Sequence, residues 1–406
     1  MPWREPFRTG DQTLVREINL SLIMNRLHRH APVSRADLAD MTGLNKSTVS
    51  SLVNDLIENG FVHEMGTSSV GVGRPSVQLT LNPEAGFIVS VEVAVGFIYA
   101  LCTDFSVKVL WELKEPIAPE TDHAEIMRRV QKVIRAAIAE GSFVLRDRKL
   151  MGIAVGVPGL VKQSDGMLLF APNLRWQQVP IGNMLREAFP GVPVFVDNEA
   201  NMAALGEYYF GAAQDYEAIL FISAGAGLGG AIVQSGKLMR GSAGFAGEFG
   251  HMTLYPDGEP CNCGNRGCWE TAVNHARLIK LVRAAIGRGE STTLDDNLTV
   301  SLIAGAARAG DSVALKAFDA IGRELGIGIA SLINILNPDL VLLGGDLSLA
   351  SDLLMTALKD ELGKHALRWS LESVTVLPSK QSDKACVMGG VAVVYQTILT
   401  RPGGIA

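Results

Sequence analysis

The first eighty residues alternate segments of helical apolar spacing with short polar breaks. Residues 14–31 place leucine and isoleucine on one helical face, and a proline follows. Ser34 then predicts the start of a second helix, and Asn45 predicts the start of a third. Residues 61–81 give two strand-like runs around a loop of glycine and serine. Helix, helix, turn, helix and hairpin predict a winged helix-turn-helix domain over residues 1–82.

Beyond residue 82 the pattern changes to apolar strands that alternate with helices. An amphipathic helix is expected around 124–140, and a long apolar one near 315–336. Several strands end in turns of glycine or asparagine: "LMGIAVGVPGLV" (150–161), "VPVFVDNEAN" (192–201), "AILFISAGAGLGGAIVQSGKL" (218–238) and "NPDLVLLGGDLS" (337–348). Strands and helices in alternation predict an α/β fold with binding loops at strand ends.

Composition narrows the class of protein. The chain has 406 residues, enough for two or three domains, and 48% hydrophobic with 19% charged residues is typical of a globular protein. A net charge of -6 argues against a protein that is coated in nucleic acid, but it does not exclude a basic patch on one face. We find neither a membrane-spanning apolar window nor an apolar leader at the start, and five cysteines make no disulfide framework. We therefore expect a cytoplasmic protein with no membrane contact.

The N-terminal end of the third predicted helix carries short polar side chains. They can contact base edges and phosphates in a major groove: Asn45, Lys46, Ser47, Thr48 and Ser50. Arg74, between Gly73 and Pro75 in the hairpin loop, suits a narrow minor groove. Winged helices also serve as protein-interaction modules, and that alternative stays open. We expect operator DNA as the partner, bound by the winged helix-turn-helix domains (the heads) of two chains.

Three cysteines lie within eight positions of the segment "CNCGNRGCWE" (261–270). From the residues alone, Cys261, Cys263 and Cys268 are fortuitous neighbours, a redox site or three ligands of a tetrahedral zinc. A tight cluster in a reduced chain favours a metal, and His251 lies ten residues before it. Four protein ligands would leave no open position, so the predicted Zn²⁺ is structural.

Several segments together resemble the ROK family, which joins bacterial sugar kinases with sugar-responsive repressors. The resemblance runs from about residue 10 to the end and is carried by "GVPGLV" (156–161), "APNLRW" (171–176), "VDNEANMAALGE" (196–207), "SAGAGLGGAIVQSGKLMRG" (223–241), "GFAGEFGHM" (244–252), "CNCGNRGCWE" and "NPDLVLLGGDLS". It implies a two-lobed, actin-like (ribonuclease H-like) fold. We expect residues 83–196 and 388–406 to form the small lobe and 197–387 the large lobe.

The resemblance also implies two sets of site residues. Its zinc ligands correspond to His251, Cys261, Cys263 and Cys268. Its sugar contacts correspond to Gly159, Asn173, Asn198, Glu199, Glu248, His251 and Glu270. One imidazole nitrogen of His251 can bind metal while the other donates to sugar, so both roles are compatible. Trp176 is expected either to stack on the sugar or to lie in the core.

Two departures from the family's kinases argue against phosphoryl transfer. Where the kinases have an aspartate base, this chain has Glu199. The extra methylene of glutamate moves the carboxylate by more than ~1 Å. Where the kinases have the phosphate loop "DxGGT", this chain has "EVAVG" (92–96), and Ala226 replaces a usual threonine in the second loop. The glycines that this second loop keeps, Gly225, Gly227, Gly229 and Gly230, have the alternative explanation that they only form a turn. We predict that the chain is not an enzyme.

The sequence therefore predicts a sugar-responsive repressor whose head binds operator DNA. The effector would be a monosaccharide such as glucose or xylose, and the protein a homodimer or homotetramer. "EVAVG" and Glu199 resemble the xylose-operon type within the family. Two alternatives stay open: an active ATP-dependent sugar kinase with an appended DNA-binding domain, and a repressor controlled by a protein partner.

Overall fold

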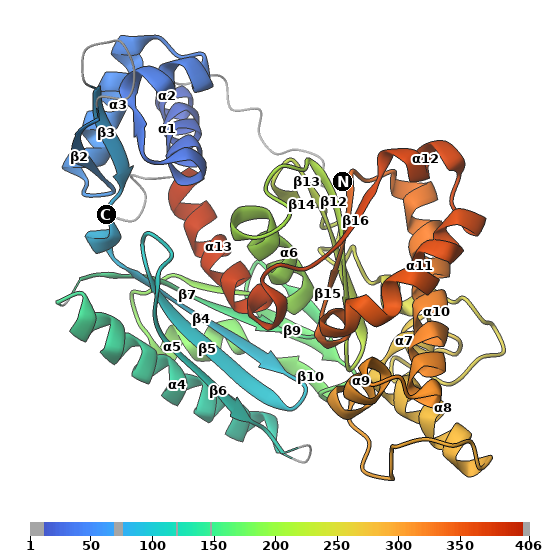
Figure 1. The fold of residues 1–406 in the computed structure, drawn as a ribbon. Helices are drawn as coiled ribbons and strands as arrows, with labels where there is room; N and C mark the ends of the chain where they lie inside the picture. Colours follow the sequence, from blue (N-terminus) through green and yellow to red (C-terminus); the bar gives the residue numbers. More distant parts are fainter. Residues whose placement is uncertain (1–11, 69–75, 119–120, 147, 401–406) are drawn as a thin grey trace.

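The fold is described from a computed structural model covering residues 12–68, 76–118, 121–146 and 148–400. Its N-terminal head is a winged helix-turn-helix, as predicted (Figure 1). Three helices pack beside a small sheet of strand order β1-β3-β2. The elements of the head are α1 (Gln12–His30), β1 (Val33–Ser34), α2 (Arg35–Thr42), α3 (Lys46–Glu58), β2 (Val62–Ser68) and β3 (Ser76–Leu81).

The helix starts in the head follow from their capping residues. Ser34 and Asp37 form a reciprocal capping box at the start of α2. The side chain of Asn45 accepts a hydrogen bond from the backbone N–H of Thr48 and caps α3. Between them Gly43 ends α2 at φ 70°, a left-handed conformation that glycine adopts without strain. These local signals explain why the sequence alone located both helices.

The small lobe is built on a five-stranded sheet of order β11-β7-β4-β5-β6. Helix α4 packs against one face, and a three-stranded sheet of order β10-β9-β8 lies near its edge (Figure 1). The elements are β4 (Phe87–Ala94), β5 (Phe97–Asp104), β6 (Val109–Pro116), α4 (His123–Val144), β7 (Leu150–Val157), β8 (Leu160–Lys162), β9 (Met167–Ala171), β10 (Trp176–Val179), α5 (Ile181–Ala188) and β11 (Val194–Asn198).

The large lobe repeats this topology in a second sheet of order β14-β13-β12-β15-β16. In both sheets three antiparallel strands are followed by two parallel ones, which is the predicted ribonuclease H-like arrangement. The elements are β12 (Ala218–Ala224), β13 (Leu228–Gln234), β14 (Lys237–Leu238), α7 (Glu270–Val273), α8 (His275–Gly287), α9 (Val300–Arg308), α10 (Ser312–Leu336), β15 (Leu340–Gly344), α11 (Ser351–His365), α12 (Arg368–Ser373) and β16 (Thr375–Pro378).

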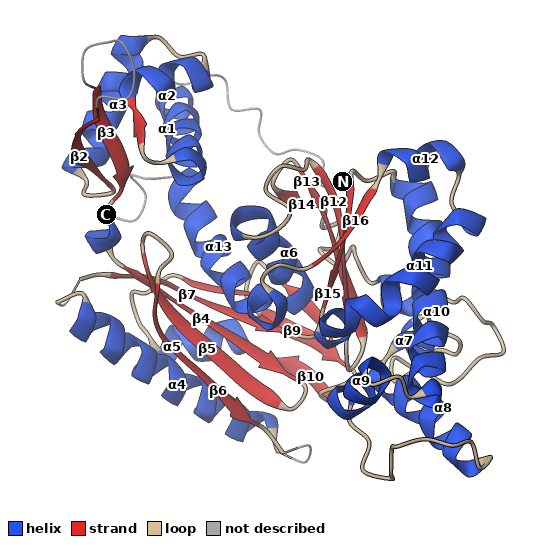
Figure 2. Cartoon of the chain, in the orientation of Figure 1, coloured by secondary structure: helices blue, strands red, loops and turns tan. Residues whose placement is uncertain are grey.

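Two apolar helices lie between the sheets, α6 (Glu199–Phe210) and α13 (Ala385–Thr400) (Figure 2). They pack so closely that a Cβ on Gly389 would lie 1.7 Å from the backbone oxygen of Met202. Because these helices belong to neither sheet alone, the predicted lobe boundaries stay a prediction. Among the described residues, no helix is both long and apolar enough to cross a membrane.

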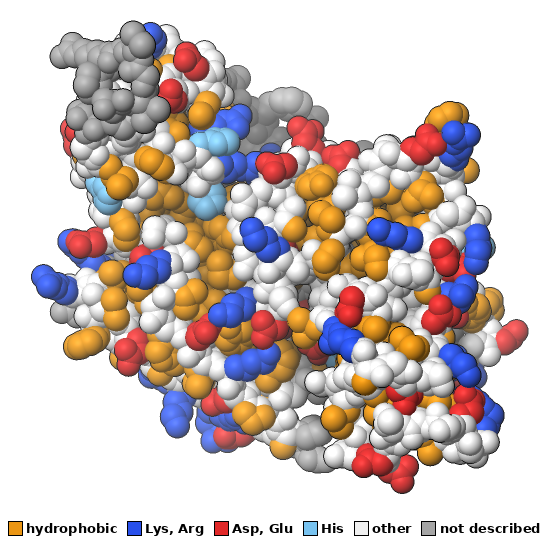
Figure 3. Space-filling view, in the orientation of Figure 1, with side chains coloured by type: hydrophobic (Ala, Val, Ile, Leu, Met, Phe, Trp, Pro, Cys, Tyr) orange, Lys and Arg blue, Asp and Glu red, His pale blue; other side chains and the backbone are white. Residues whose placement is uncertain are grey.

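The head contacts the body at the far ends of α6 and α13. The ring of His28, on α1, packs against Phe210 and Tyr395 with centroids 5.3 and 5.0 Å away. The guanidinium of Arg29 donates to the backbone oxygen of Gln214 at 2.9 Å. Figure 3 shows the head as a projection on the body, with acidic and basic side chains interspersed on the visible face. The head is thus attached to the two helices that lie between the sheets.

Candidate functional site

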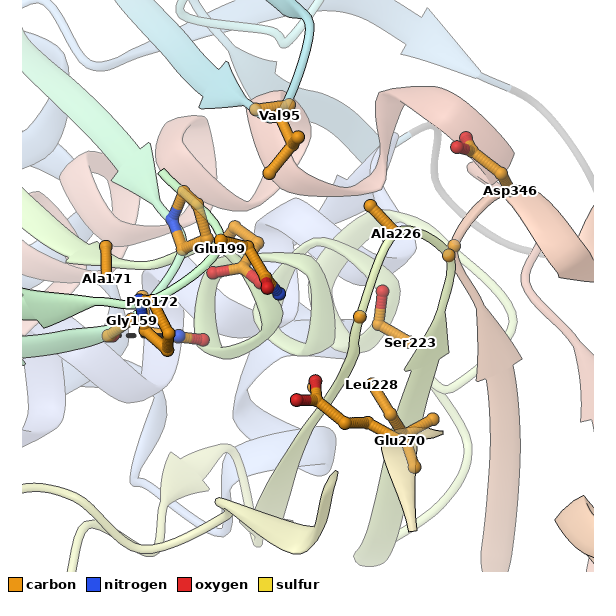
Figure 4. A pocket seen from close by; sticks show the side chains of 18 of the residues that line it. Val95, Gly159, Ala171, Pro172, Glu199, Ser223, Ala226, Leu228, Glu270 and Asp346 are labelled. Carbon is orange, nitrogen blue, oxygen red and sulfur yellow. Dashed lines mark hydrogen bonds between the residues drawn. The ribbon is translucent and has the colours of Figure 1, made fainter. Parts of the chain in front are cut away.

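A cavity of about 170 Å³ lies between the two lobes (Figure 4). A water needs roughly 10–15 Å³ by the same measure, so the space holds on the order of ten waters or one small polar molecule. Each of the seven residues assigned to sugar contact by resemblance lines it: Gly159, Asn173, Asn198, Glu199, Glu248, His251 and Glu270. The structure therefore brings together side chains that are scattered over more than 100 residues of sequence.

The turn from β11 into α6 holds Asn198 in a fixed orientation. Its side-chain oxygen accepts from the backbone N–H groups of Ala200 and Asn201 at 2.8 and 3.2 Å. Its amide nitrogen donates to the backbone oxygen of Gly159 at 3.1 Å. Gly159 has φ 107°, and a Cβ there would lie 2.3 Å from the backbone oxygen of Phe170. Only glycine fits this turn, so its backbone can line the cavity.

Two of the carboxyl groups that line the cavity belong to Glu92 and Glu199. Oε2 of Glu199 is inaccessible to solvent and has no hydrogen-bond partner among the described residues. Burial and the nearby Glu248 carboxylate together raise the pKa of Glu199 to about 8, although backbone hydrogen bonds oppose the shift. Burial likewise raises the pKa of Glu92 to about 8, although Lys114 opposes the shift. Both groups are therefore largely neutral at pH 7 and can donate as well as accept hydrogen bonds.

Glu248 and Glu270 line the opposite side of the cavity. Burial raises the pKa of Glu248, and His251 opposes that shift. Glu270 is only 5% exposed, at the start of α7. Across the lobes, Asn262 donates to the side-chain oxygen of Asn173 at 3.0 Å. Acceptors and donors thus converge from both lobes, which suits a ligand with several hydroxyl groups.

The candidate metal ligands form one compact cluster. The ligand atoms of His251, Cys261, Cys263 and Cys268 all lie within 4.8 Å of one another. The sulfurs of Cys263 and Cys268 are 3.7 Å apart, as are the sulfur of Cys261 and Nδ1 of His251. Bonds of about 2.0–2.3 Å around a tetrahedral zinc separate ligand atoms by roughly 3.5–3.8 Å. The donor set and its spacing fit a structural zinc.

His251 lies between the cluster and the cavity. Its Nδ1 faces the cluster, whereas its Nε2 lies 4.0 Å from a carboxylate oxygen of Glu248. In the same segment the sulfur of Cys261 donates to the carboxylate of Glu270 at 2.7 Å. A metal-bound thiolate has no proton to donate, so the Glu270 carboxylate would turn from the sulfur once zinc binds. The cluster and the cavity therefore share a wall.

The loop that carries the cysteines is held by close backbone contacts. Isolated β-bridges join Thr253 to Cys268 and Pro260 to Arg266. Gly267 has φ 66°, and a Cβ there would lie 1.5 Å from the backbone oxygen of Tyr255. Any side chain at this position would separate the bridged segments. The glycine spacing of the motif is thus a packing requirement of the loop.

The two loops that correspond to phosphate loops carry side chains toward the cavity. Val95, in the turn between β4 and β5, is 42% exposed and lines the space together with Ala226 of the β12–β13 turn. Figure 4 shows Val95, Ala226 and Asp346, which follows β15, around the same space. Asp346 and Ser223 also line the cavity and were not predicted. The acidic residue after a Gly-Gly turn in "LLGGDLS" was the available signal.

The polar side chains at the start of α3 lie at the surface of the head. Asn45, Lys46 and Ser47 are exposed, whereas Thr48 and Ser50 are half-buried. The hydroxyl of Ser47 donates to the side-chain oxygen of Asn45 at 2.7 Å, so part of this surface also serves the helix cap. Arg74 lies outside the described residues. For Trp176 the core alternative holds, since it is 5% exposed and packs within the small lobe.

Comparisons with known proteins agree with this architecture. The ROK family model matches residues 90–397, and the MarR family model matches residues 21–74. The xylose repressor of Caldicellulosiruptor bescii is 32% identical, covering 97% of this chain and 99% of the relative.

Two solved structures share the fold. A ROK family transcriptional regulator, a homologue of the Escherichia coli MLC protein, is 28% identical at a TM-score of 0.82, covering 95% of this chain and 97% of that one. A ROK family glucokinase from Streptomyces griseus, in complex with glucose and AMPPNP, is 30% identical at a TM-score of 0.67, covering 76% of this chain and 99% of that one. The chain therefore belongs to the ROK family, as a transcriptional repressor with an N-terminal winged helix-turn-helix.

Proposed function

We propose that the cavity between the lobes binds a monosaccharide and that the bound sugar alters the affinity of the head for operator DNA. The observation that carries this proposal is the convergence of seven predicted contact residues on one cavity. The carboxyl groups of Glu248 and Glu270 offer acceptors to sugar hydroxyls, and the largely protonated Glu199 offers a donor as well as an acceptor. Xylose and glucose are the first candidates, because a relative is named a xylose repressor and a similar structure contains glucose.

The same cavity supports the loss of phosphoryl transfer. Kinases bind phosphates through backbone N–H groups that a nearby Cβ or larger side chain obstructs. Here Val95 and Ala226 occupy the two loops, and Glu199 replaces the expected aspartate. We therefore infer binding without catalysis.

Zinc is the proposed occupant of the cysteine cluster. His251, Cys261, Cys263 and Cys268 would hold it, leaving no open position, so its contribution is to fold the loop that carries Glu270. Metal analysis of the purified protein should find about one zinc per chain. The variant Cys263→Ser should lose it and bind sugar more weakly. Normal sugar affinity in the metal-free variant would contradict the link between metal and cavity.

A melting-temperature screen against monosaccharides, with and without Mg-ATP, tests the proposed function. A ligand at 100 times its Kd stabilises the native state by about 2.7 kcal/mol, enough for a Tm rise of a few degrees. We expect a rise with one sugar and no further change with ATP. Glu270→Gln should remove the shift, while Glu259→Gln, an exposed glutamate paired with Lys280, should retain it.

Each outcome of the screen has a distinct meaning. A rise with Mg-ATP would favour the alternative of an active kinase and would call for an assay of ADP release. A Tm that no sugar changes would contradict the proposed effector site and favour control by a protein partner.

A further inference from the structure

Arg240 forms an ion pair beside the cavity to which the function proposed above gives no role. Its Nη1 and Nη2 atoms lie 3.1 and 2.5 Å from Oδ1 and Oδ2 of Asp197, a bidentate arrangement. The Asp197 side chain is 4% exposed and that of Arg240 24%, so solvent screens the pair little. Arg240 itself does not line the main cavity.

The pair joins the two sheets. Asp197 belongs to β11, an edge strand of the small-lobe sheet. Arg240 follows β14, an edge strand of the large-lobe sheet. The two side chains therefore bridge the sheets on which the two sides of the cavity are built.

On the small-lobe side, the pair supports the start of α6. Oδ1 of Asp197 accepts from the backbone N–H of Asn198 at 2.8 Å and from the side chain of Asn201 at 3.2 Å. Asn198 in turn caps α6 and donates to Gly159. The orientation of Asn198 and of the neighbouring Glu199 thus depends on where the Asp197 carboxylate is held.

On the large-lobe side, Arg240 begins the segment that carries Glu248 and His251. Its backbone oxygen accepts from the N–H of Ala246 at 3.0 Å, which closes the loop. A small space remains between this loop and the α6 start, lined by Asn198, Asn201, Phe245, Ala246 and Glu248 among others. Because side chains do not fill this space, packing alone does not fix the distance between the two segments.

We propose that Arg240 is a positioning residue for the effector. Through Asp197 it holds Asn198 and Glu199, where β11 meets α6, at a fixed distance from Glu248 and His251 in the segment after β14. This inference rests on the proposed function of the cavity. Arginine suits the role because its planar fork binds both carboxylate oxygens, which lysine cannot do.

The test uses the full-length protein and the variant Arg240→Gln. Calorimetric titration with D-xylose and D-glucose should show a Kd raised by about tenfold or more, since the variant leaves a buried carboxylate unpaired. Operator affinity without sugar should stay within about twofold of the wild type, because the hydrogen bonds of the Arg240 and Asp197 side chains all lie within the body. Asp197→Asn should behave alike, and the double variant should be no weaker than the weaker single one.

Arg308→Gln is the matched control. Arg308 forms another bidentate pair, with Asp352 at 2.9 and 2.7 Å, on the exposed side of the large lobe. This variant should bind sugar normally. Unchanged sugar affinity in Arg240→Gln would overturn the proposal, as would a parallel loss of sugar and operator affinity, which indicates general destabilisation.

A second measurement separates this proposal from the proposed function. If the wild type binds neither sugar, the proposed effector site is wrong. The positioning role of Arg240 can still be tested by hydrogen exchange in the sugar-free protein. The amides of Ala200 and Asn201 should exchange at least about fivefold faster in Arg240→Gln than in the wild type or in Arg308→Gln. Equal exchange rates in all three proteins would overturn the positioning role.

Discussion

At the residue scale, the cavity holds one carboxyl oxygen, Oε2 of Glu199, that is closed to solvent and has no hydrogen-bond partner among the described residues. Burial raises the pKa of this carboxyl to about 8, from an ordinary value of 4.5, although backbone hydrogen bonds oppose the shift. Between these two pH values the native state keeps a proton that the unfolded state has released. Stability therefore falls as pH rises from about 4.5 to 8, and no further change comes from this group above that range.

Glu199→Gln removes this titration and keeps the shape of the side chain. At 1.36 kcal/mol per pH unit the shift sets a ceiling of roughly 5 kcal/mol, which relaxation of the cavity reduces. We expect the Tm of the sugar-free variant to equal that of the wild type near pH 5 and to exceed it by several degrees at pH 9. Scanning calorimetry across this range measures the difference.

Glu140→Gln provides the control, because Glu140 is an exposed glutamate on α4. Its Tm should follow the wild type at every pH. If the Tm of Glu199→Gln also equalled that of the wild type at every pH, the Glu199 carboxyl would be solvated rather than buried.

Individual site residues were predictable where the chain marks them locally. Asn198 stands at a strand-to-helix junction, and the three cysteines stand together in sequence. Arg240 has no such mark: it lies 43 residues from Asp197, and only the packing of the two sheets brings them together. Trp176 was ambiguous in the sequence, because periodicity does not distinguish a core aromatic side chain from one that faces a ligand.

At the scale of elements, the sequence predicted best those helices that begin at a capping residue. The starts of α2 and α3 at Ser34 and Asn45 are confirmed. The short strands β8, β9 and β10 were not anticipated, because residues 158–180 carry turn residues and no clear alternation.

The pairing of α6 with α13 is likewise a property of the folded chain. Both helices are apolar on most sides, as expected of helices buried between sheets. Their contact depends on Gly389 meeting Met202, residues almost 200 positions apart. Asn198 and Glu199 lie at the start of α6 and the His28 contact at its end, so this helix connects the cavity with the head.

At the scale of the whole molecule, the resemblance supplied the two-lobed fold, but not how the head is carried. The structure adds that α1 packs on α6 and α13 through His28 and Arg29. A head attached in this way has a restricted orientation relative to its body. If two chains bind one operator, as we propose, the separation of their heads is set by the protein and not by a flexible linker.

Changing the spacing of the operator half-sites tests this view. Half-sites for paired helix-turn-helix heads lie about 34–36 Å apart, one turn of DNA, and an insertion of about 5 base pairs turns one half-site to the opposite face. On DNA that the protein selects from a random pool, this insertion should weaken binding by about 100-fold or more, toward the affinity of a single half-site. Fluorescence anisotropy gives the affinities, and sedimentation should find two chains per operator or a multiple of two. Equal affinity for both spacings would mean that one head binds alone or that the heads move freely, and the rigid attachment through α1 would then have no part in DNA recognition.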